Sequence, residues 1–159
     1  MRRKDREVTD VYEIMKIIDD CPVIHIAMTD NGKPYVVALN FGYERQGNDL
    51  ILYFHSAYEG RKIDILKRNP EVFFQMECAG RVILGTPENP CGYGYSYDSV
   101  TGSGRVEFIE DEEEKVHGLH CLIRHAGKTN EDFCFPKEML LKTCVFCLRS
   151  TDITGKRHE

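Results

Sequence analysis

The sequence predicts a mostly β protein, a small antiparallel barrel of about six strands with flanking helices. Short runs of apolar and β-branched residues alternate with turn sequences along most of the chain, as antiparallel strands do. Helical periodicity is confined to the beginning of the chain, one crossover and the region after residue 110. The chain has 159 residues with no internal repeat and no linker, so a single domain, 1–159, is expected.

Composition narrows the range of functions. Hydrophobic residues make up 42% and charged residues 30% of the chain, as in ordinary folded proteins. The formal net charge of −5 argues against a nucleic-acid partner, and no apolar run reaches the ~18 residues of a membrane span. Seven cysteines follow a charged N-terminus that is unlike a signal peptide, so reduced thiols in the cytoplasm are expected.

The first expected elements are a helix and three strands. The helix covers residues 9–20, where apolar side chains recur every three or four residues. Strands at Val23–Met28, Tyr35–Tyr43 and Leu50–Ser56 are separated by glycine-containing turns and predict an antiparallel meander. The third strand is apolar on both faces and should be covered on both sides, with another subunit as a candidate second cover.

The remaining elements complete the barrel and add a helical insertion. The barrel occupies about residues 23–110 and 143–151, and the insertion about residues 111–141, where acidic residues in the first turn suit the helix dipole. In chain order we expect a helix at Gly60–Arg68, strand Val72–Cys78, loop Gly80–Gly94, glycine-bent strand Tyr95–Ile109, a helix to about Ala126, a short helix Pro136–Leu141, strand Cys144–Ser150 and tail Ile153–His158.

One turn carries the residue types of an anion site. A strand ends at His55-Ser56, and the chain turns through Gly60 into a helix that begins with Arg61-Lys62. Backbone N–H groups at a helix start, two cations and a hydroxyl donor together favour a phosphate. A solvated Arg-Lys pair on the helix surface would explain the same sequence.

Two further segments could complete a binding surface. Strand 34–40, if it pairs with Leu50–Ser56 beside the phosphate turn, could offer its backbone to a planar, hydrogen-bonding ring; the alternative is a buried central strand. Segment 93–105 combines three tyrosines with hydroxyls and glycines. The alternative there is a bent barrel strand whose tyrosines pack at an interface.

Four motifs of the chain occur together: Phe54-His55-Ser56, Gly60-Arg61-Lys62, Asn69-Pro70-x-Val72 and Ser99-Val100-x-x-x-Gly104. In combination they resemble the FMN-binding split barrels, the family of the pyridoxamine-phosphate oxidases and their relatives. A histidine in place of the family's aromatic residue, and the closing Ile153-x-Gly155-Lys156, are more similar to the nitroimidazole-resistance branch. The resemblance covers about residues 21–110 and the last strand, and it implies a six-stranded antiparallel split barrel.

The resemblance implies an FMN site at the interface of a homodimer. His55 would lie near the reactive face of the flavin and act as the catalytic residue, because an imidazole can donate a proton near neutral pH. The other implied contacts are Ser56, Arg61 and Lys62 for the phosphate; Val36, Val37, Ala38 and Leu39 for the ring and ribityl chain; and Ser99, with Tyr97 nearby, reaching the flavin from the other subunit.

The resemblance also implies an activity. FMN supplies electron transfer, so the expected function is an FMN oxidoreductase that reduces small electrophiles such as nitroaromatic and 5-nitroimidazole compounds. The alternative is a protein that binds, stores or senses FMN without turnover. The oxidases' C-terminal Arg and His motif for substrate phosphate is missing, so vitamin oxidation is not expected. No Gly-x-Gly-x-x-Gly fingerprint is present, which leaves transient NAD(P)H or a separate reductase as electron donor.

Histidines and cysteines in the last third of the chain raise a metal-binding or haem-linked alternative. The motifs His117-x-x-His120-Cys121-x-x-x-His125 and Cys144-x-x-Cys147 contain good zinc ligands. On a helix, however, His120 lies on a different edge from the other three, and in a strand the two cysteines face opposite sides. No bound metal is therefore expected.

Overall fold

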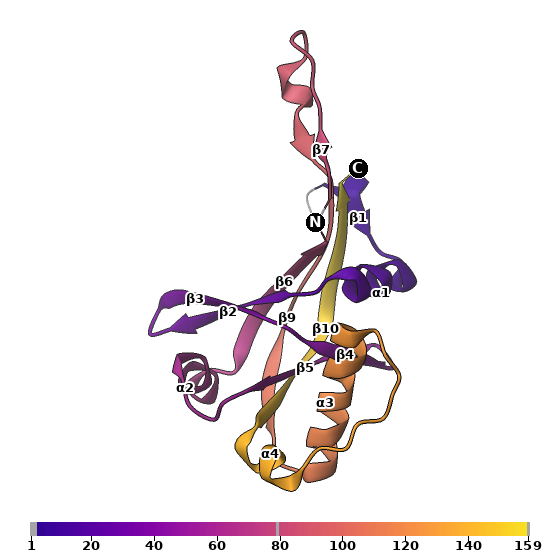
Figure 1. Cartoon of the computed structure of the whole chain (residues 1–159). Helices are drawn as coiled ribbons and strands as arrows, with labels where there is room; N and C mark the ends of the chain where they lie inside the picture. The colour runs from indigo at the N-terminus through magenta and orange to yellow at the C-terminus, as the bar shows by residue number, and fades with distance from the viewer. Residues whose placement is uncertain (1–2, 79, 159) are drawn as a thin grey trace.

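A curled antiparallel sheet forms the centre of the structure, a computed structural model that describes residues 3–78 and 80–158 (Figure 1). The strands of this sheet are β1 (Glu7–Val8), β2 (Ile24–Asp30), β3 (Lys33–Leu39), β4 (Gly42–Gln46), β5 (Asp49–Ser56), β6 (Glu71–Cys78), β9 (Tyr97–Ile109) and β10 (Cys144–His158). Their order is β3-β2-β6-β9-β10-β5-β4, with β1 paired to β10. The mostly β class is confirmed, whereas this sheet, within the described residues, has eight strands in place of the expected six.

Helices flank the sheet at the places that periodicity predicts, with ends shifted by one or two residues. They are α1 (Val11–Asp20), α2 (Arg61–Arg68), α3 (Glu112–Gly127) and α4 (Lys137–Lys142). The Asp10 side chain caps α1 by accepting hydrogen bonds from the N–H groups of Tyr12 and Glu13. In the part of the chain that the structure describes, none of the helices has the length and apolar character needed to cross a membrane.

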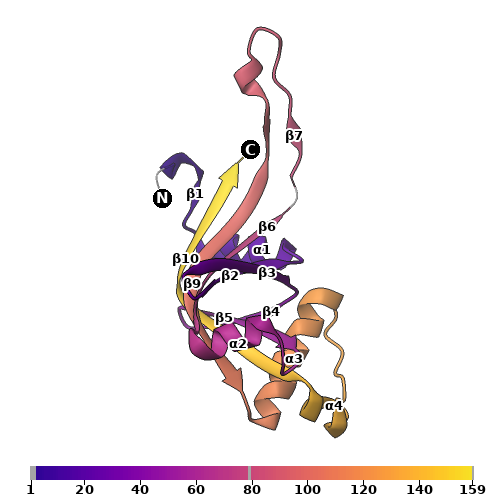
Figure 2. The same ribbon diagram turned by 90° about the vertical axis from the view of Figure 1, so that its left-hand side faces the viewer.

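The expected three-stranded meander is wrong. The predicted strand Tyr35–Tyr43 divides at Asn40-Phe41 into β3 and β4, which lie at opposite edges of the sheet. β3 therefore pairs with β2 and not with β5. The Phe41 side chain is fully buried in the main core, and this burial fixes the crossing between the two edges. Because β3 and β4 both pack against the same core, the sheet curls around it (Figure 2).

β5 is covered on both faces, as its sequence predicts. Leu52 and Phe54 join the main core inside the curled sheet, whereas Ile51 and Tyr53 pack in a second cluster with residues of α3. The second cover of this strand is thus α3 of the same chain rather than another subunit. The predicted helical insertion closes the outer side of β4, β5 and β10.

Two segments expected to lack strands contain them. β10 continues to His158, paired with β9 on both sides of an irregularity between Arg149 and Asp152, so the expected tail and the strand end at 151 are wrong. Pairing with β1 supplies a second neighbour for the last part of β10. The expected loop 80–94 projects from the sheet as an arm that carries a short ribbon, β7 (Val82–Ile83) and β8 (Gly94–Tyr95) (Figures 1 and 2).

Candidate functional site

The turn from β5 into α2 brings the predicted phosphate-binding residues to the beginning of a helix. Gly60 has a φ of 131°, a conformation that favours glycine, and it lets the chain turn directly into Arg61. The Ser56 hydroxyl donates to the carbonyl of Ala57 at 2.5 Å. Within residues 3–78 and 80–158, the Lys62 ammonium has no hydrogen-bond partner, so it is available to an anion at this turn.

Arg61 is held in place by the β2–β3 hairpin. Its Nε and Nη2 atoms each lie 3.1 Å from Asp30 Oδ2, and its guanidinium carbon lies 4.3 Å from the centre of the Tyr35 ring. Hydrogen bonds from Arg68 and Arg61 lower the pKa of the Asp30 carboxyl, which is therefore an anion at neutral pH. This arrangement orients Arg61 and leaves its Nη1 group for another acceptor.

A third cation stands beside the same turn. The buried Lys115 of α3 donates a hydrogen bond to the Tyr58 hydroxyl at 2.8 Å, which raises the pKa of Lys115. Tyr58 lies within the turn, so this contact ties the turn to α3. Sequence reasoning missed Lys115, because it follows an acidic run that the helix dipole already explains.

The four predicted ring-contacting residues of β3 face alternate sides. Val36 is 54% exposed and Ala38 is exposed, whereas Val37 and Leu39 pack against the main core. Only the side chains of Val36 and Ala38 can therefore meet a ligand on the outer face. β3 is also an edge strand, so its unpaired backbone groups can hydrogen-bond to a ligand.

His55 lies at the edge of a small apolar cavity. Because successive side chains of β5 face opposite sides, His55 shares the α3-facing side with Tyr53, and Ser56 faces the other way. The cavity has a volume of about 260 Å³ and is lined by Asn40, His55, Leu119, Leu122, Ile123, Ala126, Phe135, Met139 and Thr143. A few polar groups among apolar walls suit a small, largely apolar ligand.

β3 connects the phosphate turn with this cavity. Near its beginning, Tyr35 packs beneath Arg61, and directly after its end, Asn40 lines the cavity together with His55. The exposed side chains of Val36 and Ala38 lie between these two points. Arg61 therefore lies near the beginning of β3 and His55 near its end, although β3 does not pair with β5.

Tyr97 and Ser99 lie elsewhere in the same chain. The strand register aligns Val100 of β9 with Ile24, through Met76, whereas the phosphate turn lies beside Asp30. Six residues of β2 separate these two levels, which corresponds to about 20 Å. Tyr97 and Ser99 line a separate groove of about 430 Å³, where the ammonium of Lys156 bonds to the Tyr97 hydroxyl.

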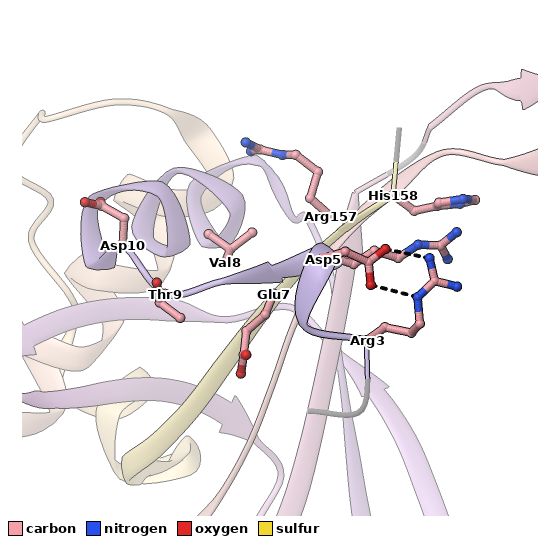
Figure 3. Close-up of a pocket in the computed structure, with 9 residues that line it drawn as sticks. Arg3, Asp5, Glu7, Val8, Thr9, Asp10, Arg157 and His158 are labelled. Atoms are coloured by element: carbon pink, nitrogen blue, oxygen red, sulfur yellow. Dashed lines mark hydrogen bonds and ion pairs between the residues drawn. The ribbon is translucent and has the colours of Figure 1, made fainter.

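A larger groove of about 650 Å³ lies between the N-terminal segment and the end of β10 (Figure 3). Its walls include Arg3, Asp5 and Arg157, and these charges are already paired: Arg3 with Asp5 at 2.6 Å, and Arg157 with Asp98 at 3.0 Å. It contains none of the predicted site residues. The groove therefore does not enlarge the candidate site.

Residues 10–157 match the family model described as pyridoxamine 5'-phosphate oxidase. The chain belongs to this family. A candidate 5-nitroimidazole antibiotic resistance protein of Bacteroides thetaiotaomicron is 34% identical, with a TM-score of 0.80 over 95% of this chain and 86% of that one. Family membership confirms the resemblance carried by the motifs around Arg61-Lys62 and the split-barrel class.

Two other solved structures share the fold of this oxidase-family member. One is the FAD and heme binding protein of Mycobacterium smegmatis, at 19% identity and a TM-score of 0.80 over 97% of this chain and 74% of that one. The other is a flavocytochrome of Azotobacter vinelandii, at 23% identity and a TM-score of 0.77 over 100% of this chain and 72% of that one. No curated protein matches the chain.

Proposed function

We propose that this chain is a homodimeric, FMN-dependent reductase of small electrophiles, nitroaromatic and 5-nitroimidazole compounds among them. The observation that carries the proposal is the position of β3 between the cationic turn at Arg61 and the cavity beside His55. A phosphate at one end and a reactive ring at the other suit an elongated cofactor of the FMN type. The 34% identical nitroimidazole-resistance candidate supports the substrate class.

The residues present fit FMN. Arg61 and Lys62, with Ser56 and the helix start, would hold the phosphate, because the Lys62 ammonium, the Arg61 Nη1 group and the helix N–H groups bring donors and positive charge there. The exposed face of β3 and its unpaired edge would hold the ring and its polar rim. When bound, FMN supplies electron transfer to the substrate. A ring N–H of His55 would deliver a proton to a substrate in the cavity.

The homodimer completes the proposal, because one chain provides only part of the site. Tyr97 and Ser99 lie about 20 Å along the sheet from the level of the phosphate turn, so a second copy would have to supply them. The outer face of the sheet also exposes Val36 and Phe73, which flank Ala27 on neighbouring strands. An exposed apolar face of this kind favours association with a partner.

The proposal includes an electron donor and a compartment. NAD(P)H bound transiently, or a separate reductase, would reduce the flavin. All seven cysteines are free thiols, which fits a reducing cytoplasm.

The test combines a spectrum with a turnover assay. We expect the purified protein to show flavin absorbance and to release FMN, identified by its mass. We then expect a 5-nitroimidazole to reoxidise the reduced protein in the absence of oxygen. Flavin binding without reoxidation by any nitroaromatic compound would favour the alternative, a protein that stores or senses FMN. A colourless protein whose melting temperature does not rise with added FMN would exclude both functions.

A further inference from the structure

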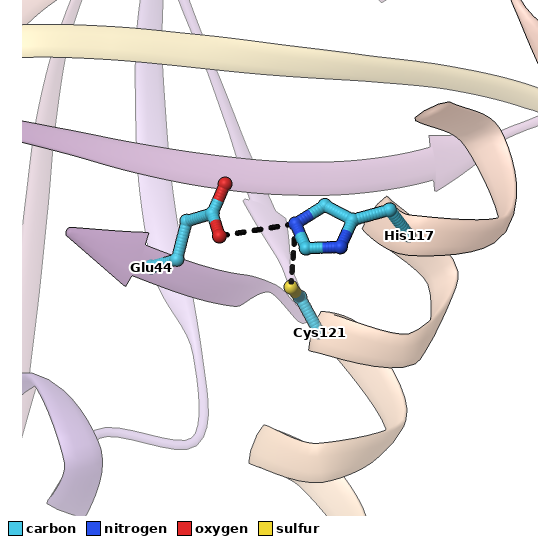
Figure 4. A group of neighbouring side chains, drawn as sticks. All are labelled: Glu44, His117 and Cys121. Carbon is cyan, nitrogen blue, oxygen red and sulfur yellow. Dashed lines mark hydrogen bonds and ion pairs between the residues drawn. The ribbon is translucent and has the colours of Figure 1, made fainter. Parts of the chain in front are cut away.

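We propose that Glu44, His117 and Cys121 form a binding site for a divalent metal ion, with Zn²⁺ as the best match. The His117 Nε2 atom lies 3.0 Å from Glu44 Oε2 and 3.7 Å from Cys121 Sγ, and the three ligand atoms all lie within 4.8 Å of one another (Figure 4). This site is separate from the residues proposed to bind FMN.

Local geometry explains how the three side chains meet. His117 and Cys121 are four residues apart on α3, so they share one face of the helix. Glu44 comes from β4, which can approach this face only because Gly42 has no side chain. A Cβ at Gly42 would lie 2.2 Å from the carbonyl carbon of Cys121. The close contact between β4 and α3 therefore places the carboxylate over the helix.

The set of donors and their spacing suit zinc. Zn²⁺ accepts thiolate, imidazole and carboxylate ligands, and in a tetrahedral site neighbouring ligand atoms are about 3.3–3.5 Å apart. The distances from His117 Nε2 to Glu44 Oε2 and to Cys121 Sγ are 3.0 and 3.7 Å, on either side of this range. On binding, the Cys121 thiol loses its proton to solvent and forms the metal–sulfur bond, and His117 coordinates through an unprotonated Nε2.

Neighbouring groups hold the carboxylate in position. The Tyr53 hydroxyl donates to Glu44 Oε1 at 2.6 Å, and Gln46 Nε2 donates to the same oxygen at 2.9 Å. These bonds leave Oε2 directed at His117. Partners of this kind, which orient a metal ligand from outside, are typical of metal sites.

The surroundings leave a route for the ion and room for a fourth ligand. Glu44 and His117 line a groove of about 560 Å³ whose walls also carry the carboxylates of Asp111, Glu113 and Glu114, together with Glu107, which is paired with Arg149. Negative potential in such a groove concentrates cations. Three protein ligands with a water at the fourth position would give an open coordination site.

The test measures metal binding to the full-length, untagged protein after removal of metal with a chelator. We expect one Co²⁺ per chain, a thiolate-to-cobalt charge-transfer band, and displacement of Co²⁺ by Zn²⁺. The variants Cys121→Ser and His117→Gln should each abolish the band or lower Co²⁺ affinity at least 100-fold. The matched controls Cys134→Ser and His120→Gln should change the affinity less than threefold.

A conservative third variant keeps the proposal falsifiable if the first two fold poorly. Glu44→Gln retains the shape of the side chain and should weaken Co²⁺ at least tenfold, with an unchanged circular dichroism spectrum. Co²⁺ binding without the band, or a folded Cys121→Ser variant that binds as well as the wild type, would overturn the proposal. Because the readout is a metal titration, it is independent of flavin content and turnover, so either proposal can fail alone.

Discussion

Arg61 and Lys62 are neighbours in the sequence but have different surroundings. Arg61 is fixed by Asp30 and by the ring of Tyr35, whereas Lys62 makes no hydrogen bond within the described part of the chain. An incoming phosphate would therefore meet one oriented guanidinium and one ammonium that is free to move toward it. Such charge-assisted hydrogen bonds are roughly twice as strong as neutral ones.

Replacement of Lys62 tests the phosphate assignment. A hydrogen bond to a charged group contributes about 1.5–3 kcal/mol, so Lys62→Ala should weaken FMN binding about 10- to 100-fold. Lys67→Ala, which removes an exposed lysine from the last turn of the same helix, should change the affinity less than twofold. Fluorescence titration of the cofactor-free protein measures both. Equal affinity of Lys62→Ala and wild type would remove Lys62 from the site.

His55 should affect turnover more than binding. Loss of a proton donor typically lowers kcat by a factor of about 10²–10⁴, so His55→Ala should reduce nitroimidazole reduction by at least 100-fold. The Kd for FMN should stay within about threefold, because the His55 side chain faces the cavity, on the opposite side of β5 from Ser56. Added imidazole should restore part of the rate. Parallel losses of affinity and rate would assign His55 to cofactor binding instead.

At the scale of the elements, the β2–β3 hairpin and α2 are held together by one carboxylate. Asp30 pairs with Arg61 and Arg68, which come from opposite ends of α2. The hairpin therefore positions the whole helix, and with it the phosphate turn. We call the two ion pairs of Asp30, with Arg61 and with Arg68, the Asp30 clamp. This clamp links the stability of the fold to the geometry of the candidate site.

The clamp predicts a pH dependence. The pKa of Asp30 is lowered in the folded state, so its ion pairs stabilise the protein above the unfolded pKa of about 3.9 and lose their effect as pH falls through the folded value. Asp30→Asn should be less stable than wild type at pH 7, and the two should converge only when the pH falls below the lowered folded-state pKa of Asp30. Denaturant unfolding across this range measures the difference. Asp132→Asn, in an exposed loop, should match wild type throughout, and a pH-independent deficit in Asp30→Asn would contradict the clamp.

At the scale of the whole molecule, the exposed outer face of the sheet is the surface proposed to mediate association of two copies. Phe73 is 51% exposed on β6 and lies in one row with Ala27 and Val36. The same face carries the proposed ring-binding side chains of β3. Association and cofactor binding should therefore depend on the same surface.

A charge placed in the row of Phe73, Ala27 and Val36 should prevent two copies of the chain from associating. Phe73→Asp should convert the homodimer into a monomer, measured by light scattering, and should lower FMN affinity at least tenfold. Tyr12→Asp, at an exposed aromatic position on α1, should remain dimeric. A dimeric Phe73→Asp variant that retains its affinity for FMN would place the interface elsewhere.

Much of this protein could be predicted from the order of its residues. Apolar periodicity located α1 and α2, because it reports which side of a helix is buried, and the acidic first turn indicated α3. The motif around Gly60-Arg61-Lys62 identified the family, because a phosphate turn is built from residues that are adjacent in the chain. The alternation along β5 correctly indicated two covered faces, since side chains of a strand alternate with a period of two.

Other features are decided only by contacts between distant parts of the chain. The crossing at Phe41, which sends β3 and β4 to opposite edges, depends on the core that both strands share. Arg61 meets Asp30, Tyr58 meets Lys115, and Glu44 meets His117 across 31, 57 and 73 residues of sequence, respectively.

The sequence by itself determined the family, the helices and the residues of the candidate phosphate turn, because each of these is encoded in local pattern. Only the tertiary structure decided the order of the strands, the partners of Arg61 and the meeting of Glu44 with His117 and Cys121. The physical reason is that local pattern specifies which face of an element is buried, whereas packing of the whole chain specifies what that face is buried against.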